Sequence, residues 1–372
     1  MPRLLILCEY PTLLGGEQSM LATLPAIRAA GFDVFIAAPP QGPLAAAIGQ
    51  FGATRVDWSV AHESGVRRPL EILRKTLAEL LQRLRPDLVH ANSLSTARIA
   101  GPVTAPQGAP SLGHLRDIIK LSEQVVADLN SHRRLIAVSR ATRDYHAMQG
   151  IDPNRCIAIH NGVDLDKFSP RPANGYLQRE LGLPADARLI ATIGQIGLRK
   201  GTDVVLAAAL QAADRLPGIH WLIVGERTSE KTESHEFEQH LHDIAAEPLL
   251  SGRVHFLGQS SDVAQLMNEC TLIVHAARQE PLSRVLLEAA ASGVAIVASE
   301  VGGTREIFPT EADGALLVPP DDRSALAEAM VTLCGDDQRR EALQIAARRR
   351  AQAAFDIRVA SARLIEQYQA LL

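Results

Sequence analysis

The sequence predicts an α/β protein made of two units, each built around a parallel sheet. Its length of 372 residues exceeds the usual size of one globular domain. Short apolar runs alternate with longer helical patterns, as in β-α-β units. The alternation is interrupted at residues 168–175, where two prolines, a glycine and an asparagine exclude a helix or a central strand. We therefore predict a first domain over residues 1–168 and a second over residues 176–354.

Each apolar run has the length of a buried strand, and the segments between the runs carry the spacing of amphipathic helices. In the first domain the predicted strands cover residues 4–8, 34–38, 88–91 and 135–138, and a helix is predicted at 18–30. In the second domain they cover residues 189–193, 220–224, 254–257, 272–275, 295–298 and 315–318, with helices at 202–213 and 283–291.

The composition excludes several classes of protein. Lys and Arg total 38 against 42 Asp and Glu, and this net charge of -4 argues against nucleic acid as a partner. The four cysteines lie far apart, which predicts neither a disulfide framework nor a zinc site. The apolar run at 4–8 is too short for a signal sequence, and no stretch approaches the roughly 20 apolar residues of a membrane span. We therefore expect a cytoplasmic protein.

A basic helical pattern at 67–85 allows two interpretations. Six Lys and Arg residues accompany a row of leucines along one face. The pattern fits an interfacial helix that makes peripheral contact with anionic lipid at the inner face of a membrane. It also fits a helix that packs its leucines on the sheet and leaves its basic face in solvent.

The segment from Ala276 to Ala290 follows an apolar strand and opens a helix. Pro281 suits the first helical position, and the backbone amides of the next residues then point out of the helix toward an anion such as a diphosphate. Glu280 stands at this helix start and Glu288 lies about 12 Å further along the axis, and both could accept hydrogen bonds from sugar hydroxyls. Alternatively, Glu280 caps the helix and Glu288 is solvated. The backbone amides expected to face the anion are those of Leu282, Ser283, Arg284 and Val285.

Two glycine-containing loops also follow predicted strands. In the loop from Gly194 to Gly201, Lys200 could neutralise a phosphate and Arg199 could bind one bidentately; the alternative is a surface turn with solvated cations. Near the start of the chain, Gly15 and Gly16 allow a ligand to approach the backbone closely. Their spacing is not GxGxxG, which disfavours a dinucleotide site.

Taken in order, these motifs resemble glycosyltransferase family 4, whose members are retaining enzymes of the GT-B fold. The resemblance covers nearly the whole chain. It implies two Rossmann-like parallel-sheet domains that face each other across a cleft, with the helix at 355–372 crossing back to the first domain. The motifs are Gly15-Gly16-Glu17, Asn161-Gly162-Val163-Asp164, the Gly194 to Gly201 loop, Glu280 with Glu288, and Gly302-Gly303-Thr304-Arg305-Glu306.

The resemblance implies that the second domain binds the nucleotide sugar. Glu288 matches the carboxylate on the ribose, Glu280 the one near the donor sugar, and Lys200 the lysine on the diphosphate, with the Gly16 amide as a further donor. Gln195 replaces the family's usual arginine, so either Arg199 or Arg284 is expected to compensate.

The resemblance also assigns residues in the first domain. His114 falls where the family often has a histidine that faces the donor sugar, and we expect it to contact substrate. The acceptor side is predicted to include His90, Asn92, Arg116 and Arg140. Asp164-Leu165-Asp166 imitates a metal-binding DxD, but it precedes the interdomain segment, so we expect no metal ion.

The implied activity is transfer of a hexosyl group from a nucleoside diphosphate sugar to an acceptor hydroxyl, with retained anomeric configuration and without a metal or another cofactor. The acceptor would be a glycan, a lipid-linked carbohydrate or a small molecule. Two alternatives share this architecture: a hydrolysing nucleotide-sugar epimerase, and a non-catalytic sugar-nucleotide-binding subunit. Nucleotide release without an acceptor would indicate the epimerase.

Overall fold

The computed structural model describes residues 1–62 and 65–372, which form two compact units. Unit 1 comprises Met1–Gly162 and Ile357–Leu372, and unit 2 comprises Val163–Asp356. The segment 168–175, where the sequence analysis places the boundary, lies in unit 2. There the amides of Asn174 and Gly175 donate to the Glu269 carboxylate at 2.8 and 2.9 Å.

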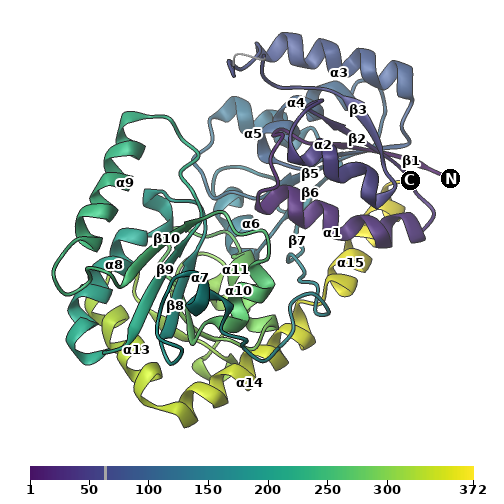
Figure 1. Cartoon of the computed structure of the whole chain (residues 1–372). Helices are drawn as coiled ribbons and strands as arrows, with labels where there is room; N and C mark the ends of the chain where they lie inside the picture. The colour runs from purple at the N-terminus through teal and green to yellow at the C-terminus, as the bar shows by residue number, and fades with distance from the viewer. Residues whose placement is uncertain (63–64) are drawn as a thin grey trace. The chain divides into compact units, whose positions relative to one another are not determined.

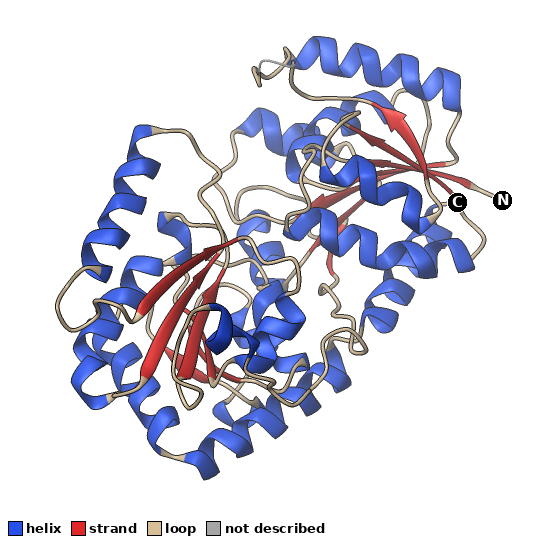
Figure 2. Cartoon of the chain, in the orientation of Figure 1, coloured by secondary structure: helices blue, strands red, loops and turns tan. Residues whose placement is uncertain are grey.

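Unit 1 is a seven-stranded parallel sheet with the strand order β3-β2-β1-β4-β5-β6-β7. Figure 1 labels these elements, and Figure 2 shows the strands in red among the blue helices. The strands are β1 (Arg3–Leu7), β2 (Asp33–Ala38), β3 (Thr54–Asp57), β4 (Leu88–Ala91), β5 (Ser111–Leu115), β6 (Arg134–Ala137) and β7 (Cys156–Ala158). The helices are α1 (Gly15–Ala29), α2 (Pro43–Ile48), α3 (Leu70–Leu84), α4 (Leu94–Thr104), α5 (Glu123–Asn130), α6 (Arg140–Ala147) and α15 (Ile357–Leu371), with a 3-10 turn η1 (Gly49–Phe51).

Helices cover both faces of the unit 1 sheet, because successive side chains of a strand point to opposite faces. On β1, Leu5 and Leu7 belong to the core under α3 and α4. Leu4 and Ile6 belong to the core under α1, which also receives Tyr368 of α15. The C-terminal helix therefore packs beside α1 in the core of unit 1, although the chain reaches it only after unit 2 (Figure 1).

Unit 2 is a six-stranded parallel sheet with the strand order β10-β9-β8-β11-β12-β13. Its largest apolar core lies between the sheet and the helices α8 and α13. The strands are β8 (Arg188–Ile193), β9 (Ile219–Val224), β10 (Val254–Gly258), β11 (Leu272–His275), β12 (Ala295–Ser299) and β13 (Leu316–Val318). The helices are α7 (Tyr176–Glu180), α8 (Thr202–Ala212), α9 (Thr232–Ala245), α10 (Val263–Glu269), α11 (Arg284–Ala291), α12 (Thr304–Ile307), α13 (Arg323–Gly335) and α14 (Asp337–Ala354), with 3-10 turns η2 (Leu198–Lys200), η3 (Ala213–Arg215) and η4 (Glu311–Asp313).

The prediction of two parallel α/β units is confirmed, and the second unit follows the predicted strands closely. The apolar runs of the first unit missed β3, β5 and β7. The outermost strands are short, and β3 is largely exposed while β7 is only partly buried. The sequence of β5, Ser-Leu-Gly-His-Leu, interrupts its apolar residues with polar ones, although every residue is buried.

The strand order reverses direction at the same place in both sheets, between β1 and β4 in unit 1 and between β8 and β11 in unit 2. In open parallel sheets, ligands bind beyond the carboxyl ends of the strands at such a switch point. The segments that follow these four strands are therefore the places to examine for a functional site.

The basic pattern at 67–85 forms α3, whose leucines Leu73, Leu77 and Leu80 are buried in the core. Arg74 pairs with the buried Asp128 at 2.8 Å. This packing agrees with the layer-helix interpretation. Within residues 1–62 and 65–372, no helix has the length and apolar character needed to cross a bilayer.

Candidate functional site

In unit 2, two loops meet at the switch point because a glycine allows their backbones to touch. Gly201 has a φ of +66°, and a Cβ placed there would lie 1.9 Å from the carbonyl oxygen of Ala276. Only glycine fits such a position without displacing backbone. The Arg278 amide also donates to the Arg199 carbonyl at 2.9 Å. The loop after β8 is therefore fixed against the loop after β11.

This contact brings Lys200 and Glu280, predicted from separate motifs, into one cluster. Lys200 Nζ lies 2.6 Å from Glu280 Oε2. His275, the last residue of β11, donates from Nε2 to the same oxygen at 3.2 Å. Only 7% of the Glu280 side chain and 2% of the His275 side chain are exposed. Lys200 and His275 line a small pocket together with Gly194 and Thr202.

Burial and nearby charge act in opposite directions on Glu280. Burial alone would favour the neutral acid, but Lys200 and the hydrogen bond from His275 outweigh it and hold the pKa of Glu280 below its usual range. Burial lowers the pKa of His275, so that imidazole is neutral near pH 7. The cluster therefore holds one lysine cation and one carboxylate, with a neutral imidazole as hydrogen-bond donor.

Helix α11 begins at Arg284, so Pro281 does not occupy its first position as the sequence analysis expected. Ser283 is the N-cap instead, because its hydroxyl accepts from the Leu286 amide at 3.3 Å. The amides of Arg284 and Val285 consequently lie in the first turn, whereas that of Leu282 precedes the cap.

Glu288 lies on α11 and is buried, not solvated, with 6% of the residue exposed. Arg284 NH2 lies 2.7 Å from Glu288 Oε1. Burial raises the pKa of Glu288, and Arg284 opposes that rise. The two predicted carboxylates therefore differ: Glu280 is paired with a lysine at the helix start, and Glu288 with an arginine one turn before it.

The remaining side chains near this cluster are placed by different contacts. Gln195 donates from its amide to the Thr228 hydroxyl and so joins the loops after β8 and β9. Arg199 donates to the Gln279 carbonyl at 3.1 Å and lies 3.9 Å from Glu280, with 47% of its side chain exposed. Arg199 is thus less tightly held than Arg284.

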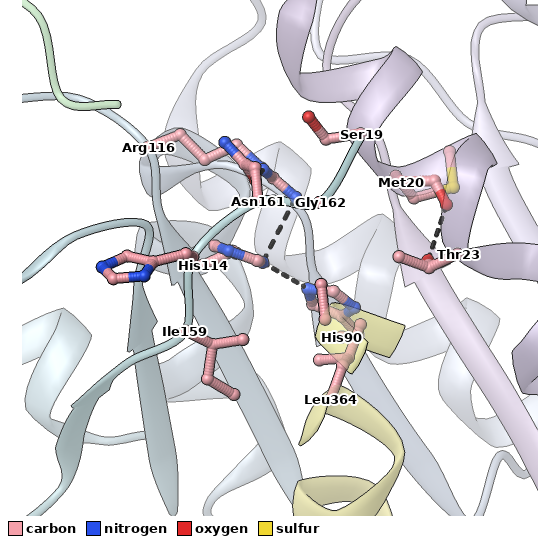
Figure 3. Close-up of a pocket in the computed structure, with 12 residues that line it drawn as sticks. Ser19, Met20, Thr23, His90, His114, Arg116, Ile159, Asn161, Gly162 and Leu364 are labelled. Atoms are coloured by element: carbon pink, nitrogen blue, oxygen red, sulfur yellow. Dashed lines mark hydrogen bonds between the residues drawn. The ribbon is translucent and has the colours of Figure 1, made fainter. Parts of the chain in front are cut away.

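In unit 1, a recess enclosing about 380 Å³, part of it open to solvent, lies beside the ends of β4 and β5 (Figure 3). His90, His114 and Arg116 line it, together with Asn161 and Gly162. The recess therefore brings together three of the side chains predicted for the first domain, those of His90, His114 and Arg116. Arg140 begins α6 and is exposed, and it does not line this recess.

Arg116 is held by amide oxygens. It donates to the Asn92 carbonyl and to Asn92 Oδ1, each at 2.8 Å, and to Asn161 Oδ1 at 3.2 Å. The Asn92 amide donates in turn to the Gly16 carbonyl at 3.3 Å. Asn92, Gly16 and Asn161 therefore belong to this site, where they hold Arg116 in place.

Two residues of importance were not predicted. Tyr368 of α15 lies with its hydroxyl 2.6 Å from His90 Nδ1, and His275 contacts Glu280. His275 could have been identified from the sequence, because it is the polar residue that ends the apolar run Leu-Ile-Val-His. Nothing in the sequence connects Tyr368 with His90.

Asp164 of the DxD-like segment accepts from the amides of Asp166 and Lys167 at 3.0 Å and so closes a local turn.

Comparison with known proteins gives consistent matches. Residues 14–167 match the model of Glycosyltransferase Family 4, and residues 176–350 match Glycosyl transferases group 1. The chain is 34% identical over 185 residues to D-inositol 3-phosphate glycosyltransferase of Mycobacterium tuberculosis and Mycobacterium bovis. That match spans 49% of this chain but only 37% of the length of those relatives.

The fold matches solved structures over the full chain. HepE of Anabaena, solved with UDP and glucose, has a TM-score of 0.87 at 22% identity, with all of both chains covered. Sucrose-phosphate synthase of Thermosynechococcus elongatus has a TM-score of 0.79 at 21% identity, covering 100% of this chain and 99% of that one. The resemblance seen in the motifs is confirmed, and the chain belongs to the glycosyltransferases of the GT-B fold.

Proposed function

We propose that the chain transfers a hexosyl group from a nucleoside diphosphate sugar to an acceptor hydroxyl. The observation that carries the proposal is the cluster of Lys200, Glu280 and His275 at the unit 2 switch point, next to the start of α11. A lysine cation and the first-turn amides of a helix N-terminus together suit a diphosphate. A buried carboxylate fixed beside them suits a sugar hydroxyl.

The donor is proposed to lie along α11. Its diphosphate would contact Lys200 and the amides of Arg284 and Val285, its sugar Glu280, and its ribose Glu288. Glu280 precedes the start of α11 and Glu288 lies about one turn inside the helix, so the sites for the sugar, the diphosphate and the ribose follow one another in that order. HepE was solved with UDP and with UDP-glucose, so UDP-glucose is the first donor to test.

The proposed reaction breaks the bond between the anomeric carbon and the phosphate oxygen and forms one to the acceptor oxygen on the same face. The acceptor proton passes to the leaving phosphate, so the products are the glycoside and the nucleoside diphosphate. Negative charge develops on the diphosphate, where Lys200, Arg199 and the α11 amides would stabilise it. We propose that these groups suffice without a metal ion or another cofactor.

We place the acceptor at the recess of unit 1. Imidazole and guanidinium donors and the hydroxyl groups of Ser19 and Thr23 line it, which suits a carbohydrate. For a lipid-linked acceptor, the exposed basic residues Lys75 and Arg83 of α3 would contact anionic headgroups, each contributing about 1 kcal/mol. Sedimentation with vesicles of phosphatidylglycerol, but not of phosphatidylcholine, would support that contact, and its loss in Lys75→Glu/Arg83→Glu would locate it.

Donor binding is tested by thermal shifts with UDP, GDP, ADP, TDP and CDP. A nucleotide at 100 times its dissociation constant stabilises the folded protein by about 2.7 kcal/mol. We expect one base to give a clear shift. No shift with any of the five would count against a nucleotide-sugar donor.

Turnover is tested by nucleotide release from the identified donor, with and without a mixture of sugar and polyol acceptors. We expect acceptor-dependent release and a product of retained configuration by proton NMR, unchanged by EDTA. Release together with epimerised sugar in the absence of acceptor would indicate an epimerase. Tight binding without turnover would indicate a binding subunit. An inverted product, or activity lost with EDTA and restored by divalent ions, would contradict retention or metal independence.

A further inference from the structure

A chain of hydrogen bonds runs from the C-terminal helix to His114 inside unit 1. The Tyr368 hydroxyl lies 2.6 Å from His90 Nδ1, and His90 Nε2 lies 3.3 Å from His114 Nδ1. Arg116 NH2 also lies 3.3 Å from His114 Nδ1. Figure 3 shows His114 joined by dashed lines to both Arg116 and His90.

The direction of every bond in this chain follows from Arg116. A guanidinium only donates, so His114 Nδ1 must accept. His90 Nε2 must then donate to the same nitrogen, which leaves His90 Nδ1 as an acceptor. The Tyr368 hydroxyl therefore donates. In this arrangement the single proton of a neutral His114 is on Nε2.

Their surroundings keep both imidazoles neutral. Burial lowers the pKa of His90 to about 3, with Arg116 and His132 adding to the effect. Burial, Arg116 and His90 together hold the pKa of His114 well below its usual value. The hydroxyl of Tyr368 is protonated as well, because its burial raises the pKa of that group.

His114 Nε2 is the open end of the chain. It is buried and has no hydrogen-bond partner among the described residues, and only 5% of His114 is exposed. A buried donor without an acceptor costs free energy that a bound oxygen would recover. His114 also lines the unit 1 recess. An N–H held in this way can donate to a hydroxyl oxygen but cannot take its proton.

We propose that Tyr368 and His90 are positioning residues that fix His114 as a neutral imidazole protonated on Nε2, so that it acts on a carbohydrate oxygen as a hydrogen-bond donor and not as a base. The carbohydrate part of this statement rests on the proposed function. The arrangement of the protons does not. The last residues of the chain thereby become part of the unit 1 site, since Tyr368 comes from α15.

The proton positions are measured directly by long-range ¹H–¹⁵N correlation spectra of the histidine rings in the full, unliganded chain at pH 7. Signals are assigned from their loss in His90→Gln and His114→Gln. We expect both His90 and His114 to be neutral and protonated on Nε2. A proton on Nδ1 of either ring, or a charged ring, would overturn the proposal whether or not the protein is a transferase.

Two amide variants separate the relay from a packing role. Glutamine places its amide about where imidazole Nε2 lies, and asparagine places its amide about where Nδ1 lies. His90→Gln can therefore still donate to His114, whereas His90→Asn cannot. We expect kcat/KM of His90→Asn to lie about 10-fold below that of His90→Gln, near the upper value for one hydrogen bond. Equal losses in the two folded variants would contradict the relay.

Tyr368→Phe removes only the hydroxyl. We expect kcat/KM to fall about 3- to 10-fold and the His90 ring to show a mixture of tautomers. Tyr145→Phe on α6 is the control, with unchanged activity and spectra. An unaltered His90 ring in Tyr368→Phe would exclude Tyr368 from the relay. If no donor and acceptor support turnover, the proposed function fails, and the ring spectra of the wild type and Tyr368→Phe still decide the relay.

Discussion

The two units place a buried histidine at equivalent strands and give it opposite surroundings. His90 in β4 and His275 in β11 both follow the switch point of their sheet, and they are 1% and 2% exposed. His90 contacts a tyrosine and a second histidine, whereas His275 contacts the Glu280 carboxylate. The same fold position therefore supports a neutral donor chain in unit 1 and a charged cluster in unit 2.

A repeated architecture therefore carries two different chemical environments. Unit 2 combines a lysine, a carboxylate and a helix N-terminus, which suits a charged diphosphate and its sugar. Unit 1 offers neutral imidazoles and an arginine already engaged with amide oxygens, which suits uncharged hydroxyls. The chemistry depends on what the loops bring to each strand end, and the sheets alone do not determine it.

The largest effect is expected at the charged cluster. Lys200→Ala removes the cation proposed for the leaving diphosphate and should lower kcat by about 100- to 1000-fold. The measurement is steady-state nucleotide release with the donor identified by thermal shift. Lys231→Ala, at the exposed start of α9, is the matched lysine control and should retain activity. A loss below 10-fold in Lys200→Ala would mean that unit 2 handles the phosphate by other groups.

The glycines of the two units should respond differently to the same substitution. At Gly201 an alanine meets the Ala276 carbonyl at 1.9 Å with a φ of +66°, so Gly201→Ala should cost at least about 2 kcal/mol from left-handed strain and overpacking. At Gly16 the nearest atom lies at 3.4 Å and no left-handed backbone is required. Gly16→Ala should change stability by less than about 1 kcal/mol.

Urea unfolding measures both costs. Gly218→Ala is the control for backbone strain alone, because its φ is +71° and nothing lies within 4 Å of the added Cβ. It should cost about 1 kcal/mol. If Gly201→Ala costs no more than Gly218→Ala, the close approach of the two unit 2 loops is not what requires glycine there.

The sequence allowed unit 2 to be predicted in more detail than unit 1. The strands of unit 2 are mostly apolar runs, and Lys200, Glu280 and Glu288 lie after such strands in segments whose spacing is recognisable. In unit 1, β5 carries Gly113 and His114 between apolar residues, so periodicity alone did not identify it.

The hydrogen-bonded partners were beyond sequence reasoning in both units. Tyr368 reaches His90 only because α15 returns to the unit 1 sheet after all of unit 2. The return of the helix was expected from the resemblance, but its rotation and register were not. Likewise, α11 begins after Ser283, whose hydroxyl caps the helix, and not at Pro281, although proline is favoured at a first helical position.

A change in pH should affect the two units in different ranges. The folded-state pKa of His90 is lowered from 6.5 to about 3. Between these values the unfolded chain binds a proton that the folded protein does not, so this group lowers the free energy of unfolding by about 1.4 kcal/mol for each unit that the pH decreases. His90→Gln should remove that slope from unit 1. Glu280 is ionised in both states above its usual value of 4.5, so its own titration adds no pH dependence to the stability of unit 2 above pH 5.

The chain's two tryptophans make the units separately visible. Trp58 is buried in unit 1 and Trp221 in unit 2. In Trp221→Phe, tryptophan fluorescence monitors the urea unfolding of unit 1. In Trp58→Phe, it monitors the urea unfolding of unit 2. If the free energy of unfolding of unit 1 depends on pH in the same way in the wild type and in His90→Gln between pH 6.5 and 5, then His90 is protonated in the folded protein. That result would contradict the neutral His90 described for unit 1.

The smallest expected effect concerns the arginines. Arg116 of unit 1 is held by three hydrogen bonds to asparagine oxygens, whereas Arg199 of unit 2 is nearly half exposed and bonded to one carbonyl. We therefore expect Arg199 to turn toward a bound diphosphate and to supply the positive charge that the resemblance places at the position of Gln195. Because an exposed charge contributes up to about 1 kcal/mol, Arg199→Ala should raise the donor dissociation constant only about 3- to 5-fold.

Titration calorimetry at two salt concentrations checks this, with Arg215→Ala on the surface of unit 2 as the control. The loss in Arg199→Ala should shrink at high salt, since screening weakens an exposed pair more than a buried one. Arg284 is the competing candidate, and its guanidinium already pairs with the buried Glu288. If Arg199→Ala binds the donor as wild type does, while Arg284→Gln weakens binding without loss of stability, then Arg284 replaces the missing cation and Glu288 must release it when the donor binds.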